Sequence, residues 1–234
     1  MPSPSRFSVL VPACLLLALA CESKAPAERE PAANAATAKQ ATTAAPAPVS
    51  VSGTAKVGSP APDFELADLD GNKVKLSSFK GKTVVLEWFN PECPFVKKSH
   101  AEGSLVNTAA RLAQNNVVWL AINSGAPGKQ GHGADMNRAA AKAFGMNHPI
   151  LLDETGAVGK AYGAKRTPHL YVIDPSGVLV YRGAIDNSPD GEGQSPEGGK
   201  LVNYVDATLA DMGAGRPVAK AETEAYGCSV KYAN

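Results

Sequence analysis

The stretch T-V-V-L-E-W-F-N-P-E-C-P-F-V-K-K-S-H, residues 83–100, carries the strongest structural pattern of the chain. Its first seven residues, Thr83 to Phe89, form an apolar run rich in β-branched and aromatic side chains, which is typical of a buried strand. An Asn-Pro turn follows, and Cys93 then precedes apolar residues at helical spacing as far as Leu112. The stretch therefore predicts a strand, a tight turn and a helix that begins at a cysteine.

A cysteine at the start of a helix is favoured as the thiolate, because the first-turn N–H groups and the helix dipole stabilise a negative charge. Pro94 suits this position, since its missing N–H would have no partner in the first turn. Lys97 and Lys98 add positive charge nearby. We therefore predict that the pKa of Cys93 lies below the ordinary value of about 8.5. The alternative is that Cys93 is a small, inert hydrophobic residue at the end of a strand.

The first residues of the chain, 1–20, resemble a bacterial signal peptide. Arg6 precedes a charge-free run from Val9 to Ala20, which is shorter than the roughly 20 apolar residues of a spanning helix. The junction L-A-L-A-C at residues 17–21 resembles a lipobox, in which Cys21 would carry a lipid. The alternative is ordinary cleavage after Ala20, which would leave Cys21 unmodified.

Residues 21–55 predict a flexible linker, because Ala, Pro, Thr, Lys and Glu dominate and no aromatic residue occurs. Residues 56–234 have the length of one domain. The formal net charge of +1 and the lack of a long basic run argue against nucleic acid or an anionic membrane surface as a partner. We expect a protein of the bacterial cell envelope, on the periplasmic side, that meets the membrane only through the lipid on Cys21.

Within the domain, strand and helix patterns alternate. An Asp-Gly turn at residues 70–71 predicts a hairpin. Further strands are expected at 117–122, 149–152, 170–174 and 178–182, further helices at 135–144, 157–162 and 198–212, and a solvent-exposed loop at 188–199. This order predicts an α/β fold with a central mixed β-sheet and helices on both faces.

Several motifs resemble the alkyl hydroperoxide reductase and thiol-specific antioxidant branch of the thioredoxin-like superfamily. They are the opening G-x-x-A-P-D-F-x-L-x-D-x-D-G-x-x-V-x-L at residues 58–76, the strand G-K-x-V-V-L at 81–86 and the cysteine that follows it. The segment C-P-F-V-K-K-x-H at 93–100 and the tail Y-G-C-S-V-K-Y at 226–232 are similar to a group of peroxiredoxin-like bacterial redoxins. The resemblance implies a thioredoxin-like fold and a redox-active Cys93.

The resemblance also implies roles for residues around Cys93. Thr167-Pro168 corresponds to a cis-proline turn that faces the active-site sulfur and leaves a backbone edge free for a substrate strand; alternatively, proline is simply tolerated at a strand start. Glu87 corresponds to a buried acid, although a strand residue facing water at the sheet edge is the alternative. His169 follows Pro168 and is placed to approach the sulfur.

Three features depart from the related families. Val96 occupies the position of the second cysteine of a C-x-x-C motif, and Asn90 replaces the threonine that typical peroxiredoxins carry three residues before the cysteine. The arginine expected near residues 166–169 is not evident. The remaining candidate for a resolving thiol is Cys228, whose aromatic and β-branched neighbours predict a docked tail; the alternative is a buried, inert cysteine.

Two functions follow as alternatives. The first is an exported thiol oxidoreductase that attacks an oxidised protein thiol or a small peroxide through Cys93 and is restored by an external thiol reductant. The second is a non-catalytic binding module for copper or for a protein partner. Lys97 stands where a copper carrier of this fold would have its second cysteine, and His100 lies two helical turns beyond Cys93. We therefore expect no bound metal and no other cofactor.

Overall fold

The computed structural model describes residues 50–196 and 199–234. The predicted signal peptide, Cys21 and most of the predicted linker lie outside these residues. None of the helices in the described part of the chain has both the length and the apolar character needed to cross a membrane.

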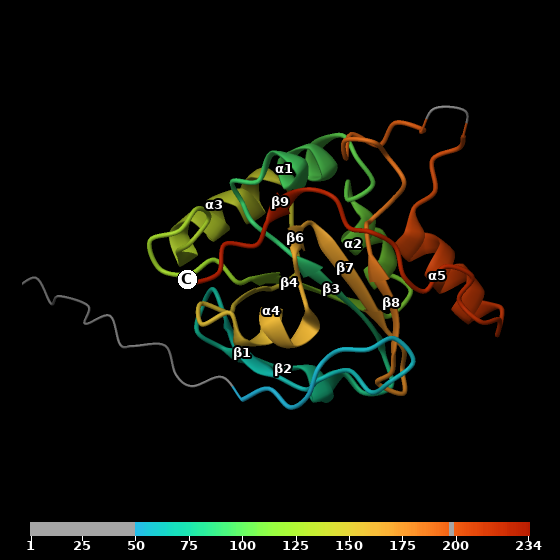
Figure 1. Ribbon diagram of the computed structural model, residues 1–234, viewed down its shortest axis with the longest axis horizontal. Helices are drawn as coiled ribbons and strands as arrows, with labels where there is room; N and C mark the ends of the chain where they lie inside the picture. The colour runs from blue at the N-terminus through green and yellow to red at the C-terminus, as the bar shows by residue number, and fades with distance from the viewer. Residues whose placement is uncertain (1–49, 197–198) are drawn as a thin grey trace, which may run out of the picture. The chain divides into compact units, whose positions relative to one another are not determined.

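A mixed sheet of seven strands forms the centre of the domain (Figure 1). Strands β3, β4 and β5 are parallel, and the other neighbouring pairs are antiparallel. The order is β2 (Lys73–Lys75), β1 (Glu65–Asp68), β5 (Ile150–Leu152), β4 (Val117–Asn123), β3 (Thr83–Trp88), β7 (His169–Ile173) and β8 (Leu179–Gly183). A separate pair joins β6 (Arg166–Thr167) to β9 (Cys228–Ser229). The central strand β3 therefore ends directly before the Cys93 turn.

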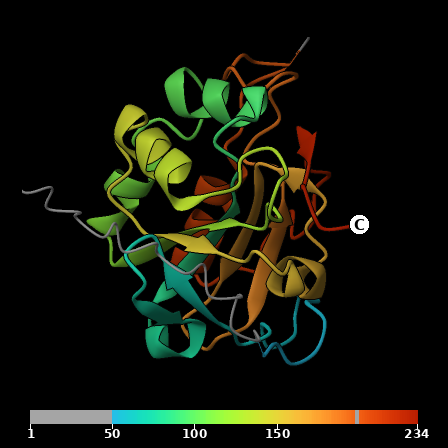
Figure 2. The same cartoon turned by 90° about the vertical axis from the view of Figure 1, so that its left-hand side faces the viewer.

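Alternation of side chains along β3 divides the core between the two faces of the sheet. Val84, Leu86 and Trp88 pack on one face with α4 (Ala157–Tyr162) and with residues near η1 (Leu76–Phe79). Val85 and Phe89 face the other side, which is covered by α1 (Pro94–Ala101), α2 (Thr108–Ala113), α3 (Ala134–Ala143) and α5 (Tyr204–Gly213). Figures 1 and 2 show α4 on one side of the central strands and α1 and α3 on the other. The prediction of helices on both faces is confirmed.

Two helix predictions need correction. The pattern after Cys93 forms two helices, because the chain turns at Gly103, where a Cβ would lie only 2.8 Å from the Ser99 Cα, and at Asn107, whose φ is 55°. The last helix begins at Tyr204 rather than near residue 198, since the Asn203 side chain caps it by accepting a hydrogen bond from the Asp206 N–H at 3.0 Å.

The packed part of the chain also begins slightly before residue 56. Ala55, which composition placed in the linker, is buried, and its N–H donates to the Ala161 carbonyl at 2.8 Å. Val51 packs against the same core. Composition missed this because alanine and valine are common in both linkers and cores.

Candidate active site

Cys93 stands at the N-cap of α1, as predicted. Its N–H donates to the Asn90 carbonyl at 3.1 Å, and its carbonyl accepts from the Lys97 N–H at 3.0 Å. The Asn90 side chain fixes the preceding turn by accepting from the Glu92 N–H at 2.9 Å. Cys93 is 0% exposed. The strand, turn and helix predicted from residues 83–100 thus place one buried sulfur at a helix start.

The turn at Thr167-Pro168 lies against this sulfur. The peptide bond is cis, as predicted, and the Cys93 thiol donates to the Thr167 carbonyl at 3.1 Å. The Thr167 hydroxyl is buried and has no hydrogen-bond partner among the described residues. When Cys93 ionises, this hydroxyl is free to donate to the thiolate.

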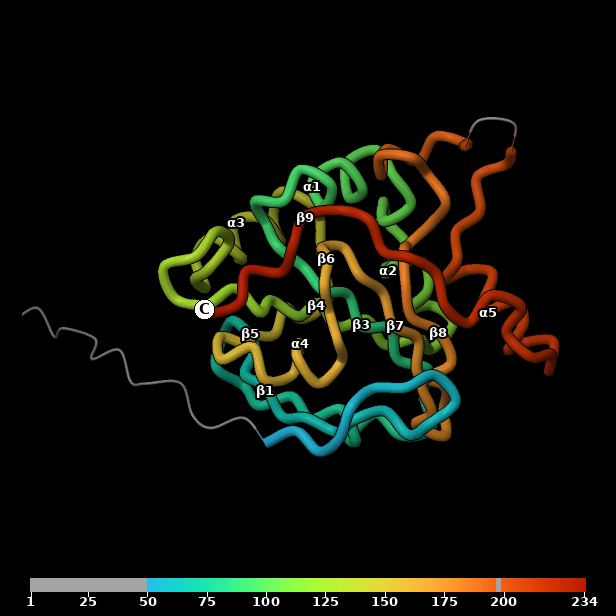
Figure 3. Tube along the Cα trace, in the orientation of Figure 1, coloured from blue at the N-terminus to red at the C-terminus, as the bar shows by residue number. Residues whose placement is uncertain are grey.

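The C-terminal tail docks on the same turn. In the β6–β9 pair, Cys228 lies opposite Thr167, and Ser229 lies opposite Arg166. Figure 3 shows the tail running past β6 towards the end of the chain beside α3. Both cysteines are free thiols, and the Cys228 side chain packs against the cluster that contains Cys93. The structure therefore brings together the predicted nucleophile and its only predicted resolving partner.

The environment shifts the pKa values of the two thiols in opposite directions. Burial alone raises the pKa of Cys93. Four groups that can donate to its thiolate, the Cys228 thiol, the Thr167 hydroxyl and the Val96 and Cys228 N–H groups, lower the pKa below the ordinary value. Burial, together with the charge and hydrogen bond of Cys93, raises the pKa of Cys228 to about 11. At neutral pH, Cys93 is therefore the better nucleophile of the pair.

The two lysines of α1 have a smaller part than predicted. Lys97 is exposed, and Lys98 forms an ion pair with Glu192 of the loop after β8. The direction predicted for the Cys93 pKa is confirmed, and the helix start contributes through the Val96 N–H, but the other causes are hydrogen bonds from the Thr167 turn and the tail rather than the lysines. Sequence reasoning credited the lysines because they are near Cys93 along the chain.

The loop at 188–199 was expected to be solvent-exposed, yet part of it packs at the end of α1, with Gly191 buried.

Glu87 is buried in the centre of the sheet at 0% exposure, so the prediction of a buried acid is confirmed and the edge alternative is wrong. One carboxylate oxygen lies 2.8 Å from His100 Nε2, and the other accepts from Trp119 Nε1 at 3.0 Å. Burial raises the pKa of Glu87, but the charge and hydrogen bond of His100, together with His148 and Trp119, outweigh it and lower the pKa overall. The His100 ring also stacks on Phe144 with centroids 5.2 Å apart.

Sequence reasoning missed the pairing of Glu87 with His100. A usable indication was present, because a carboxylate that is fully buried needs a cationic or hydrogen-bonding partner. His100 is the basic residue of α1 on the side that faces the sheet.

His169 does not take the predicted position beside the sulfur. It lies opposite Trp88 in the sheet, and its Nδ1 is 3.2 Å from the Tyr171 hydroxyl and 3.5 Å from the Lys165 N–H. Burial, with Arg182 and Lys165 nearby, lowers its pKa to about 4. The correction follows from strand alternation, which directs His169 to the face of the sheet that α4 covers. In the described part of the chain, no group of three or more His, Cys, Asp or Glu side chains could hold a metal ion.

Comparison with known proteins decides the family. The Redoxin family model matches residues 56–197. The chain belongs to the Redoxin family. Solved structures agree on the thioredoxin-like fold: this redoxin aligns with an uncharacterized conserved protein from Geobacillus kaustophilus at 32% identity and a TM-score of 0.64, covering 81% of this chain and 98% of the other. A hypothetical protein from Sinorhizobium meliloti aligns at 28% identity and a TM-score of 0.66, covering 78% and 98%.

Curated relatives of this redoxin include two bacterial thiol-disulfide oxidoreductases. The ResA protein of Geobacillus thermodenitrificans is 34% identical over 123 residues, which are 52% of this chain and 65% of the relative. ResA of Bacillus subtilis is 31% identical over 123 residues, 53% of this chain and 64% of the relative. The matched part thus spans a little under two thirds of these relatives. The predicted resemblance to redoxins is confirmed at the level of the family.

Proposed function

We propose that this redoxin exchanges thiols and disulfides through Cys93 and that Cys228 resolves the mixed disulfide. The observation that carries the proposal is the placement of Cys228 opposite Thr167, where its side chain packs against the cluster that contains Cys93. The names of the two relatives as thiol-disulfide oxidoreductases support the same chemistry. The substrate class is an oxidised protein thiol.

In the first step, the Cys93 thiolate attacks one sulfur of the substrate disulfide. The substrate S–S bond breaks, its second sulfur leaves as a thiolate and takes a proton from water, and a Cys93–substrate disulfide forms. Hydrogen bonds from Cys228 and Thr167 lower the pKa of Cys93 and so favour the thiolate for this step. The raised pKa of Cys228 keeps that residue protonated, so it does not compete as the attacking thiol.

In the second step, Cys228 becomes the nucleophile. The mixed disulfide removes the negative charge and the hydrogen bond of Cys93, two of the causes that raise the pKa of Cys228, while Lys231 and Arg166 still lower it. The Cys228 thiolate then attacks the Cys93 sulfur and releases the second substrate thiol. The products are a reduced substrate and a Cys93–Cys228 disulfide, and an external thiol reductant returns two electrons to restore the redoxin.

Peroxide reduction is the weaker alternative. It would oxidise Cys93 to a sulfenic acid, which Cys228 would convert to the same disulfide with loss of water. Asn90 occupies the position of the peroxiredoxin threonine, and its side chain is engaged in the turn, with Nδ2 donating to the Gln130 carbonyl at 3.3 Å. Disulfide exchange is therefore the better-supported reaction.

We also propose that the domain works in the bacterial cell envelope, on the periplasmic side, tethered through a lipid on Cys21. The support is the apolar run that ends in L-A-L-A-C at residues 17–21 and the composition of the segment after it. Metabolic labelling with a palmitate analogue tests the anchor. The expected label is lost in Cys21→Ser and kept in Cys14→Ser, which changes a cysteine inside the predicted signal peptide.

The reaction is tested with the chromogenic disulfide 5,5′-dithiobis(2-nitrobenzoate) and peptide mass mapping of the reduced protein. We expect wild type to end with a Cys93–Cys228 disulfide and no adduct on either residue, whereas Cys228→Ser should retain one thionitrobenzoate on Cys93. Stable adducts on both cysteines of wild type would refute resolution by Cys228. A Cys93 whose reaction rate rises with pH only around the ordinary thiol pKa of about 8.5 would refute the activated nucleophile.

A further inference from the structure

The C-terminal segment Tyr226–Tyr232, which we call the strap, covers the site it is proposed to serve. Cys93 has no exposed surface, and the strap lies on the Thr167 turn beside it. Gly227 shows how closely the two segments meet, because a Cβ at this position would lie 2.2 Å from the Thr167 carbonyl oxygen and 3.5 Å from Phe95 Cβ. With the strap in this position, no disulfide or other reagent can reach the sulfur.

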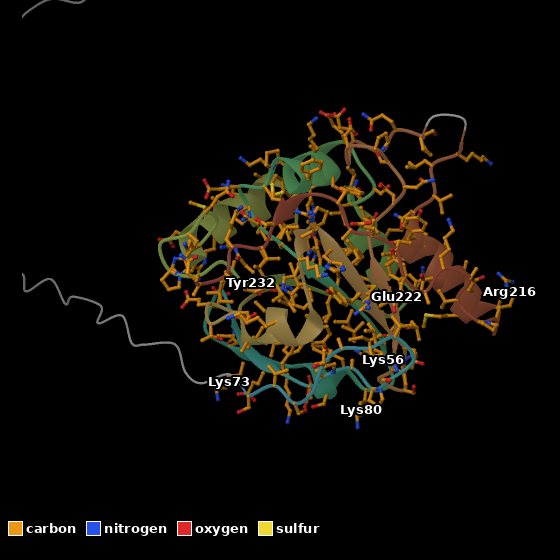
Figure 4. The ribbon with its side chains drawn as sticks, viewed as in Figure 1. Lys56, Lys73, Lys80, Arg216, Glu222 and Tyr232 are labelled. Atoms are coloured by element: carbon orange, nitrogen blue, oxygen red, sulfur yellow. The ribbon has the colours of Figure 1, made fainter. Side chains whose placement is uncertain are left out.

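Two tyrosine hydroxyls fasten the strap at its ends. The Tyr226 hydroxyl donates to Asp186 Oδ1 at 2.8 Å, and its ring lies 6.1 Å from that of Phe95 in α1. At the other end, the Tyr232 hydroxyl donates to the Ala164 carbonyl at 2.8 Å. Figure 4 labels Tyr232 at the end of the strap, near α4. We call these two hydrogen bonds the latches.

The helix beneath Tyr232 is shaped to receive it. A Cβ at Gly156 would lie 2.6 Å from Tyr232 Cδ1, and one at Gly159 would lie 2.4 Å from its hydroxyl oxygen. Glycine weakens a helix interior, so Gly159 in the short helix α4 is best explained by the space that the tyrosine ring needs. Gly156 and Gly159 thus leave the space that the Tyr232 ring occupies against the domain.

Between the latches, few backbone hydrogen bonds join the strap to the rest of the domain. Strand β9 has only two residues. Beyond it, the Val230 N–H donates to the Lys165 carbonyl at 3.2 Å, and the Lys231 carbonyl accepts from the Ala126 N–H at 2.9 Å. A short segment with few hydrogen bonds opens more readily than the core strands do.

We propose that the strap is an autoinhibitory gate that must unpair from β6 before any substrate reaches Cys93. Closed, it shields the thiolate and holds Cys228 against it. Open, it exposes both the sulfur and the backbone edge of β6. Closure after the first exchange step returns Cys228 to the Cys93 sulfur. The proposal rests on Cys93 being the reactive thiol of the proposed function, but it does not require Cys228 to resolve.

The test measures the rate at which iodoacetamide modifies Cys93 in the full chain, followed by peptide mass mapping. Cys228→Ser serves as the background, so that resolution cannot contribute. The pH is raised until the rate reaches its plateau, where Cys93 is fully ionised and the rate reports access rather than pKa. Each latch variant, Tyr226→Phe and Tyr232→Phe, should raise the plateau rate by about fivefold, and the double variant by more than tenfold. Gly227→Ala should raise it as well, because the added Cβ displaces the strap from Thr167.

Two controls separate opening of the strap from general destabilisation. Tyr204→Phe removes a hydroxyl that makes no hydrogen bond within the described residues and should leave the rate unchanged. Hydrogen exchange of the latch variants should increase in peptides covering residues 226–232, while β3 stays protected. Unchanged plateau rates in all strap variants would overturn the gate and leave the proposed function standing. A Cys93 that stays inert even after the strap is shown to open would instead overturn the proposed function.

Discussion

Cys228 lies directly opposite Thr167 in the β6–β9 pair and packs against the cluster that contains Cys93, although the two cysteines are far apart in the sequence. Thr167 connects them, because its carbonyl accepts the Cys93 thiol and its backbone pairs with the strand that carries Cys228. A lone cysteine at a helix start thus acquires a second thiol from the end of the chain.

The Cys228 thiol should be one source of the lowered Cys93 pKa. Cys228→Ala removes a donor to the thiolate, so the pKa of Cys93 should rise, whereas Cys228→Ser keeps a donor and should raise it less. The measurement is the alkylation rate of Cys93 as a function of pH. Equal pKa values in the two variants would show that the Cys228 side chain contributes no hydrogen bond.

Loss of His100 should destabilise the fold more than loss of an exposed cation. His100→Ala leaves the Glu87 carboxylate buried with Trp119 as its remaining partner, so the free energy of unfolding should fall by about 3–5 kcal/mol. The matched control is Arg111→Ala, which breaks the exposed ion pair with Asp206 and should have a much smaller effect. Urea unfolding at neutral pH compares them, and similar losses in both variants would contradict this account of Glu87.

Stability should fall in mild acid because of His169. Its pKa is about 4 in the folded protein and about 6.5 in the unfolded chain. Between these values the unfolded state binds a proton that the folded state does not, so the free energy of unfolding decreases as the pH falls. We expect a loss of about 2 kcal/mol from this residue between pH 7 and pH 5.

The control for this pH effect is His169→Gln, which keeps a hydrogen-bond acceptor but does not titrate. The stability of the variant should decrease less over the same pH range. His148 should account for part of the decrease that remains, because burial also lowers its pKa to about 4. Urea unfolding at the two pH values measures both proteins. Identical pH dependence in wild type and variant would exclude His169 as the cause.

Local patterns were sufficient to predict much of the fold and part of the site. The apolar run at β3, the turn at Asn90 and the start of α1 at Cys93 each follow from a few adjacent residues. The cis bond before Pro168 was expected from family resemblance. Such features depend on neighbouring residues and on backbone preferences, which a sequence displays directly.

Features that depend on distant parts of the chain were predicted less well. The pairing of Glu87 with His100 requires α1 to lie over β3 in one orientation, and the latch between Tyr226 and Asp186 requires a loop and the tail to meet. The position of His169 depended on which face of β7 it occupies. Spacing along the chain does not encode these relationships, since they arise only when the elements pack.

Mild oxidation of the reduced full-length protein, followed by peptide mass mapping, tests the central claim most directly. The account predicts a Cys93–Cys228 disulfide within one chain, absent from Cys228→Ser, where Cys93 should instead progress to sulfinic acid. The contradictory result is a wild-type protein in which Cys228 remains a free thiol while Cys93 alone is over-oxidised. Cys228 would then be a packing residue, and Cys93 would depend on a thiol from another molecule.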